Sequence, residues 1–151
     1  MVGPGGVAPQ RITTVVSPLP HAAVPYANLR DADENQLREL GRKLRWHPAL
    51  PKGANVNFYE IVGEDLLFER TFERGVEDFT YACGTGTGSV VTVLTLQGKV
   101  SGQGVQVDMT GGRLVIDAER VHARIASLYL TGPTNVVCKG EVTDEDLMIQ
   151  M

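Results

Sequence analysis

The sequence predicts an α+β fold in which strands outnumber helices. Short runs of alternating or β-branched residues recur along most of the 151-residue chain and are separated by glycine-containing turns. One segment, residues 31–44, instead has the apolar spacing of a helix. The composition, 42% hydrophobic and 21% charged, suits a globular core, and a chain of this length is expected to form one folded unit.

Charge and composition weigh against several classes of partner. The net charge of −4 at pH 7 disfavours binding to nucleic acid or to anionic lipid, because both need clustered Lys and Arg. No apolar run approaches the roughly 18 residues of a membrane span. Residues 1–10 form a glycine- and proline-rich tract without the features of a secretory signal. A cytoplasmic location and a small-molecule partner are therefore expected, with neither nucleic acid nor membrane.

The chain has two cysteines, Cys83 and Cys138, which are too few for a disulfide framework. Free thiols are therefore expected, and either cysteine is a candidate working thiol. The three histidines are scattered and no C-x-x-C pair is present, so no metal site is expected.

The first expected elements are a strand and a helix. Residues 11–16 are largely β-branched and predict a short strand, which ends in a loop at the proline-rich residues 17–21. In residues 31–44 the leucines are three or four positions apart. Acidic residues come first there and basic residues last, an order that complements a helix dipole. Residues 46–53 contain two prolines and a glycine and predict a loop.

A hairpin is expected next. Residues 55–62 and 65–72 have the composition of strands, and the Gly63-Glu64 pair between them predicts a tight turn. The polar segment 73–78 predicts a further turn.

The apolar run 90–96 is open to two interpretations. Its Val and Thr residues favour a strand, whereas the preceding glycine-rich loop, residues 81–89, is of a kind that usually leads into a helix. Three strands are expected beyond it, the first two flanking a turn at Gly111-Gly112, at residues 104–109, 113–118 and 123–130.

The glycine-rich loop contains Cys83, followed directly by Gly84-Thr85-Gly86. It satisfies neither the G-x-G-x-x-G nor the P-loop pattern, so nucleotide binding is weakly supported. Glycines after a cysteine let backbone N–H groups point into one small volume. If a helix begins there, its dipole stabilises a thiolate at Cys83 and a carboxylate held by the amides of Gly84 and Thr85. The alternative is a buried cysteine beside a turn.

Other polar candidates also have a structural alternative. Glu73 and Arg74 form a charge pair at a strand end, which either binds a polar ligand or is a solvated surface pair. Asn55 and Asn57 alternate onto one strand face, where their amides either bind a ligand or cap a turn. His21, taken alone, is expected to be structural.

In combination, these segments resemble the successive motifs of the diaminopimelate epimerase family, in that family's order. The resemblance covers residues 11–142 and leaves residues 143–151 as an acidic tail. Its motifs are PHA at 20–22, PKGANVNF at 51–58, RTFERGVED at 70–78, ACGTG at 82–86, GGRL at 111–114 and LTGP at 130–133.

The resemblance implies the C-terminal lobe of such an enzyme. A full-length member has two similar lobes, each with a catalytic cysteine, and the C-G-N-G motif of the first lobe does not occur here. The implied fold is a curved mixed or antiparallel sheet wrapped around a central helix that begins near Cys83. The implied activity is the cofactor-independent, two-thiol interconversion of LL- and meso-diaminopimelate in lysine and cell-wall precursor biosynthesis.

The resemblance also implies roles for individual residues: Cys83 as one acid–base thiol, Gly84 and Thr85 as donors to the reacting carboxylate, Glu73 for the substrate ammonium, Arg74 for a carboxylate, Asn55 for the distal end of the substrate and His21 in support. Cys138 lies in residues 135–139, which resemble the family's final strand, and is expected to be structural. The expected partner for catalysis is a missing first lobe or a homo-oligomer partner.

Two positions depart from the family pattern. Leu19 stands where the family usually has Asn, which removes an amide that contacts the distal end of the substrate. Phe79 intervenes before Thr80. A related racemase acting on another amino acid is therefore one alternative, and a non-catalytic remnant or binding module is another.

Overall fold

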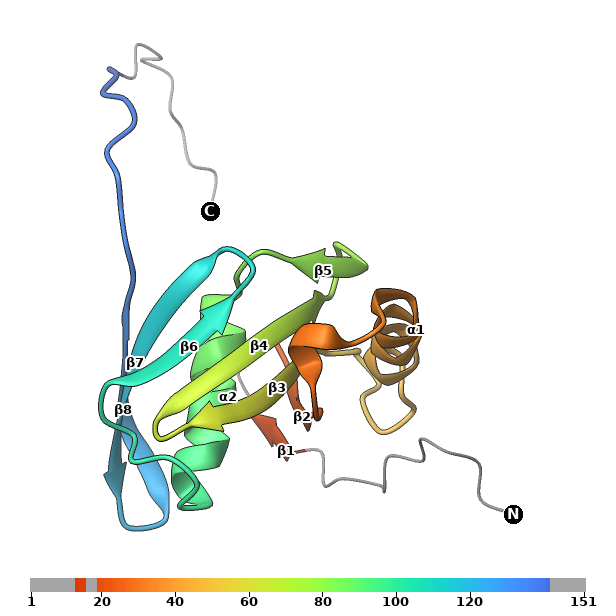
Figure 1. Cartoon of the computed structure of the whole chain (residues 1–151), viewed down its shortest axis with the longest axis horizontal. Coiled ribbons are helices and arrows are strands. Elements are labelled where there is room, and N and C mark those ends of the chain that lie inside the picture. The colour runs from red at the N-terminus through yellow and green to blue at the C-terminus, as the bar shows by residue number, and fades with distance from the viewer. Residues whose placement is uncertain (1–12, 16–18, 142–151) are drawn as a thin grey trace, which may run out of the picture.

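The computed structural model of the chain describes residues 13–15 and 19–141 (Figure 1). Both terminal tracts expected from the sequence, 1–10 and 143–151, lie outside the described residues. The elements are β1 (Thr13–Val15), β2 (His21–Pro25), a 3₁₀ helix (Leu29–Asp31), α1 (Glu34–Arg45), β3 (Asn55–Gly63), β4 (Leu66–Glu73), β5 (Asp78–Thr80), α2 (Gly84–Leu96), β6 (Val105–Met109), β7 (Gly112–Val121) and β8 (Arg124–Thr131).

The strands form one mixed sheet in the order β1-β2-β3-β4-β6-β7-β8, with β5 added beside β4. Two pairs, β2 with β3 and β4 with β6, are parallel, and the other pairs are antiparallel. Helix α2 contacts strands at both ends of this order, β1 and β8, as well as β2, β3 and β7. A single helix reaches both ends only if the sheet curves around it, as Figure 1 shows. The α+β class and the central helix are confirmed.

Strand alternation divides the core into two layers. Side chains on one face pack around α2, including Tyr59, Leu67 and Val107. Side chains on the opposite face pack against α1 and include Phe58 and Phe72. Because neighbouring residues of a strand point to opposite faces, β3 and β4 contribute to both layers. No helix among the described residues is long and apolar enough to cross a membrane.

Helix α1 has the start and end that its sequence favours. The Asp33 side chain accepts a hydrogen bond from the Gln36 N–H at 2.9 Å and so caps the first turn, and basic residues occupy the last turn. Its inner face is buried at Leu37, Gly41 and Arg45. Gly41 sets how closely the helix approaches the sheet, because a Cβ there would lie 2.8 Å from Cγ of Phe72.

Gly41→Ala is expected to lower the thermal stability of the chain. Alanine favours a helix interior by about 1 kcal/mol over glycine, but overpacking a buried contact costs about 1–3 kcal/mol. The ring of Phe72 is fully buried and cannot swing into solvent, so the second effect dominates. Thermal unfolding followed by circular dichroism measures the balance. An unchanged or raised midpoint would mean that α1 moves away from the sheet at little cost.

Two of the expected elements need correction or completion. Residues 17–21 were expected to form a loop, yet His21 is the first residue of β2. This strand is buried between β1 and β3 and begins with a histidine and two alanines, so it lacks the alternation that marks a half-exposed strand. The run 90–96 lies in helix α2. The sheet surrounds this helix, and its β-branched residues are therefore buried on several sides.

The strand expected at residues 135–139 is not formed. Residues 132–141 have no regular secondary structure, and Val136 and Val137 are 83% and 90% exposed. A strand needs a neighbour for its backbone hydrogen bonds, and no described strand lies beside this segment. Cys138, which is expected to be structural, is exposed as well and belongs to neither core layer of the described residues.

Candidate active site

Cys83 is the N-cap residue of α2, directly after β5 and a short connection. Its carbonyl accepts hydrogen bonds from the Thr87 N–H at 2.9 Å and from the Thr87 hydroxyl at 3.0 Å, which fixes the first turn. The N–H groups at the start of a helix have no acceptor within the helix. Those of Gly84 and Thr85 belong to this first turn, beside the thiol, and the Thr85 side chain is exposed.

Cys83 is 9% exposed, and its thiol has two polar neighbours. The Asn55 side-chain amide donates to Sγ at 3.8 Å, and the Thr85 hydroxyl lies 3.7 Å from it. Burial raises the pKa of the thiol, while the Gly86 N–H and the Thr85 hydroxyl act to lower it. The helix donors therefore act in the direction expected from the sequence, but desolvation outweighs them and the group is a thiol at neutral pH.

Glycine is needed on α2 because side chains from β3 and β8 pack closely against its first turn. A Cβ at Gly86 would overlap Oδ1 of Asn57 and lie 3.2 Å from Sγ of Cys83. The Cβ of a residue at 84 would lie 2.9 Å from Leu130 on β8. Neither glycine has a positive φ, so close approach and not backbone conformation accounts for both.

Asn55 connects the thiol to the turn after β4. It is fully buried, and its Oδ1 accepts a hydrogen bond of 2.8 Å from the Arg74 N–H while its Nδ2 faces Cys83. Both ends of the amide are thus engaged within the chain. A contact of Asn55 with the distal end of a substrate stays a prediction.

Glu73 is half-buried at the end of β4, next to Arg74. Its negative charge acts to raise the pKa of both Cys83 and His21. His21 is fully buried, and desolvation lowers its pKa below the ordinary value, so the ring is neutral at pH 7. Its Nδ1 lies 3.3 Å from Nδ2 of Asn57, and its Nε2 has no hydrogen-bond partner among the described residues.

The fold brings the candidate residues of the sequence analysis to one place, the N-terminal end of α2 and the strand ends that face it. Sequence reasoning missed two further polar residues there, Glu69 and Thr71, which are buried on the same face of β4 as Glu73. The alternation of β4 was the available signal, since every second residue from Glu69 to Glu73 is polar and faces α2.

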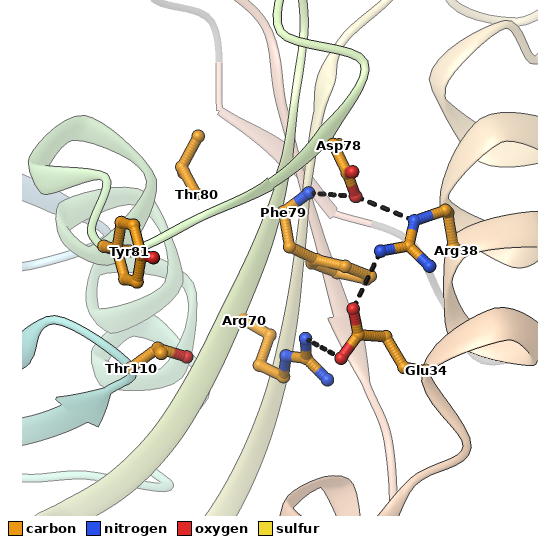
Figure 2. Close-up of a pocket in the computed structure, with 8 residues that line it drawn as sticks. All are labelled: Glu34, Arg38, Arg70, Asp78, Phe79, Thr80, Tyr81 and Thr110. Atoms are coloured by element: carbon orange, nitrogen blue, oxygen red, sulfur yellow. Dashed lines mark hydrogen bonds and ion pairs between the residues drawn. The ribbon is translucent and has the colours of Figure 1, made fainter.

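The inserted Phe79 lies away from this site. Its ring packs 5.7 Å from that of Phe72, in the layer on the α1 side, and the guanidinium of Arg70 lies over it at 4.3 Å. Figure 2 shows it beside a cavity edged by ion pairs of Arg38 with Glu34 and Asp78, at 2.7 and 2.8 Å. The insertion therefore extends the opposite layer and adds no side chain to the surroundings of Cys83.

Comparison with known proteins gives consistent matches in sequence. The family model described as diaminopimelate epimerase matches residues 13–137. The diaminopimelate epimerase of Leptospira biflexa is 40% identical over 123 residues, which are 82% of this chain and 41% of that enzyme. The one from Aquifex aeolicus is 38% identical over 131 residues, 85% of this chain and 45% of the enzyme. The chain thus spans less than half the length of these relatives.

Solved structures agree on the fold. A phenazine biosynthesis protein of the PhzF family from Bacillus anthracis has a TM-score of 0.51 at 16% identity, covering 74% of this chain and 33% of that one. A probable proline racemase from Agrobacterium radiobacter K84 has the same score and identity over 75% of this chain and 38% of its own. With the extent of the sequence matches, these observations lead to one conclusion: the chain belongs to the diaminopimelate epimerase family.

Proposed function

We propose that this chain forms the C-terminal half of an amino-acid epimerase, with Cys83 as one of two acid–base thiols and diaminopimelate as the substrate. One observation carries the proposal: a shielded thiol lies at the N-terminus of helix α2, beside the backbone N–H groups of its first turn, and its pKa responds to the charge of Glu73. Such an arrangement suits removal of a proton next to a carboxylate.

The proposed reaction balances with two thiols and requires neither metal nor other cofactor. One sulfur, as thiolate, takes the α-proton and becomes a thiol, and the other thiol gives its proton to the opposite face of the carbon and becomes a thiolate. The carbanion between these steps is stabilised where its carboxylate accepts hydrogen bonds from the Gly84 and Thr85 amides. Arg74 suits a carboxylate through its planar fork, and Asn55 is the proposed contact for the distal end.

Substrate charge would help to activate Cys83. The Glu73 carboxylate acts to raise the pKa of the thiol. A substrate ammonium paired with Glu73 cancels that effect and so lowers the thiol pKa when substrate is bound. His21 supports this arrangement as a neutral ring, because its pKa is lowered by burial.

The second thiol must come from another lobe. Cys138 is exposed and lies in the extended segment after β8, outside the surroundings of Cys83. On β8, Leu128 and Leu130 adjoin the glycines of α2 but are 45% and 49% exposed. We place the partner lobe against this apolar edge, either as a separate first lobe or as a second copy of this chain, which would bring its own Cys83 to the site.

Leu19 favours a second candidate function. An aliphatic side chain in place of the family's amide suits an amino acid whose distal end is less polar than that of diaminopimelate. In that case the same thiol chemistry would operate as a racemase on another amino acid. A non-catalytic binding module is the third outcome.

Isotope exchange in heavy water distinguishes these functions. The chain is incubated with diaminopimelate or with other amino acids, alone and with a separately produced first lobe of the Leptospira biflexa relative, and deuterium at the α-carbon is followed by mass spectrometry. We expect exchange into diaminopimelate only when both lobes are present. Exchange by the chain alone, at high concentration, favours the symmetric dimer, and exchange into another amino acid favours the racemase. No exchange under any condition contradicts the proposed enzyme.

A further inference from the structure

Four polar side chains are buried side by side beneath the first turns of α2. They come from three adjacent strands: His21 on β2, Asn57 on β3, and Thr71 and Glu69 on β4. None is more than 4% exposed. A buried carboxyl group is unusual unless it is paired with a cation, and no described Lys or Arg forms an ion pair with Glu69.

Their hydrogen bonds form a continuous chain. Glu69 Oε1 lies 3.2 Å from the Thr71 hydroxyl, and that hydroxyl lies 3.0 Å from Asn57 Oδ1. On its other side, the Asn57 amide nitrogen lies 3.3 Å from Nδ1 of His21 and 3.4 Å from the carbonyl of Ala22. This series of hydrogen bonds thus runs from Glu69 in the interior of the sheet to the His21 ring beside the candidate active site.

Donor counting fixes the direction of each bond. The Ala22 carbonyl is only an acceptor, so the Asn57 group facing it must be the NH₂, and its second hydrogen then goes to Nδ1 of His21. The neutral ring therefore carries its proton on Nε2. At the other end, Asn57 Oδ1 needs a donor, and the single proton of the Thr71 hydroxyl supplies it.

Glu69 must then be protonated. The Thr71 hydroxyl has one proton, which it donates to Asn57. An ionised Glu69 carboxylate would then have no hydrogen to accept from the Thr71 oxygen and would be repelled by it. A neutral Glu69 carboxylic acid instead donates its own proton to that oxygen. The Thr87 hydroxyl is nearby on α2, but its proton is donated to the Cys83 carbonyl. Glu69 Oε2 has no hydrogen-bond partner within the described part of the chain. Burial raises the pKa of Glu69 to about 7, although the Thr87 and Thr71 hydroxyls act to lower it, so the protonated acid is the main form below neutral pH.

We propose that Glu69 is a positioning residue for the candidate active site: its proton keeps the Thr71 hydroxyl directed at Asn57, which in turn holds His21 with Nε2 protonated. Loss of that proton draws the Thr71 hydrogen to the carboxylate and leaves Asn57 Oδ1 without a donor. The assignment of hydrogen bonds stands on geometry alone. Its consequence for catalysis rests on the function proposed above.

The groups around Glu69 allow its titration to be isolated. Its neighbour across β3 is Tyr59, whose pKa is raised by burial, so the phenol stays neutral near pH 7. The inward-facing residues of β6 are apolar, and α2 presents Thr87. The candidate active site adds the ionisable groups of Cys83, Glu73, Arg74 and His21. Burial raises the pKa of Cys83 and lowers that of His21.

The test is nitrogen NMR of the histidine rings in the whole chain between pH 5.5 and 8.5. His47 and His122 are exposed and serve as internal references. We expect the His21 ring to have a protonated Nε2 and an unprotonated Nδ1. We expect the NMR signals of both nitrogens to shift with a midpoint near pH 7 as Glu69 ionises. Protonation of the ring itself differs, because both nitrogens then become protonated, and it requires a lower pH.

Three variants make the test decisive. Glu69→Gln, which stays neutral and can still donate to Thr71, is expected to keep the tautomer and abolish the midpoint near pH 7. Thr71→Val removes the relay and is expected to weaken the shift at least severalfold, and Thr71→Ser, which keeps the hydroxyl, is expected to retain it. A midpoint that persists in Glu69→Gln, an undiminished shift in Thr71→Val, or a His21 ring protonated on Nδ1 would overturn the proposal. These signals are read without substrate, so they do not depend on the enzyme being active.

Discussion

Cys83→Ala is expected to reduce epimerisation by the assembled two-lobe enzyme by roughly 10²- to 10⁴-fold, the usual contribution of a positioned acid–base group. With this thiol absent, no other cysteine of the described residues lies at the site to take or give a proton on its side of the substrate carbon. The change removes one small buried sulfur next to Asn55 and Thr85, so the fold is expected to persist. The rate of interconversion of the two isomers is measured by chiral chromatography.

The matched control is Cys138→Ala. Cys138 is exposed and lies in the segment after β8, so its loss is expected to leave the rate unchanged. Circular dichroism of both variants checks that each is folded. If Cys83→Ala kept more than about a tenth of the activity while folded, Cys83 would not be an acid–base thiol, and the proposed function would lose its central residue.

Gly86→Ala is expected to disrupt both stability and catalysis. A Cβ at this position overlaps Oδ1 of Asn57, which is fully buried and hydrogen-bonded to Thr71 and His21. Either Asn57 gives up these bonds or the start of α2 moves, together with Cys83. Overpacking of this kind costs about 1–3 kcal/mol, more than the gain of about 1 kcal/mol from replacing glycine in a helix. Urea unfolding gives the change in stability.

Gly88→Ala, two residues further along α2, is the control for this change. It has the same gain in helix propensity, but its Cβ meets only the end of the Leu128 side chain, which is flexible and 45% exposed. We expect Gly88→Ala to be neutral or stabilising. If the two variants unfolded at the same urea concentration, the close contact between Gly86 and Asn57 would carry no energetic weight.

Several elements could be predicted because their sequence patterns are local. The hairpin expected at 55–62 and 65–72 is observed as β3 and β4 within one residue at each end. Helix α1 begins three residues later than predicted because Asp33 caps it. In each case a turn, a cap or a regular spacing within the segment settles its structure.

Other elements depend on distant residues. Strand β2 forms because β1 and β3 lie on either side of it, and β5 forms because β4 offers it an edge. The run 90–96 has the β-branched composition of a strand but is helical because the curved sheet buries it from several directions. The segment 135–139 has strand-like residues and no strand beside it, and so it is not a strand.

For the candidate site, the sequence by itself determined the chemistry available: a cysteine followed by glycines, a Glu-Arg pair, a histidine and alternating asparagines. Only the tertiary structure decided how these groups interact. Asn55 faces inward, where it joins the thiol to the turn at Arg74. Glu69, which no motif identifies, lies at the end of the hydrogen-bond chain that reaches His21. The physical reason is that burial and hydrogen-bond partners are set by strands far apart in the chain, and these determine pKa values and proton positions.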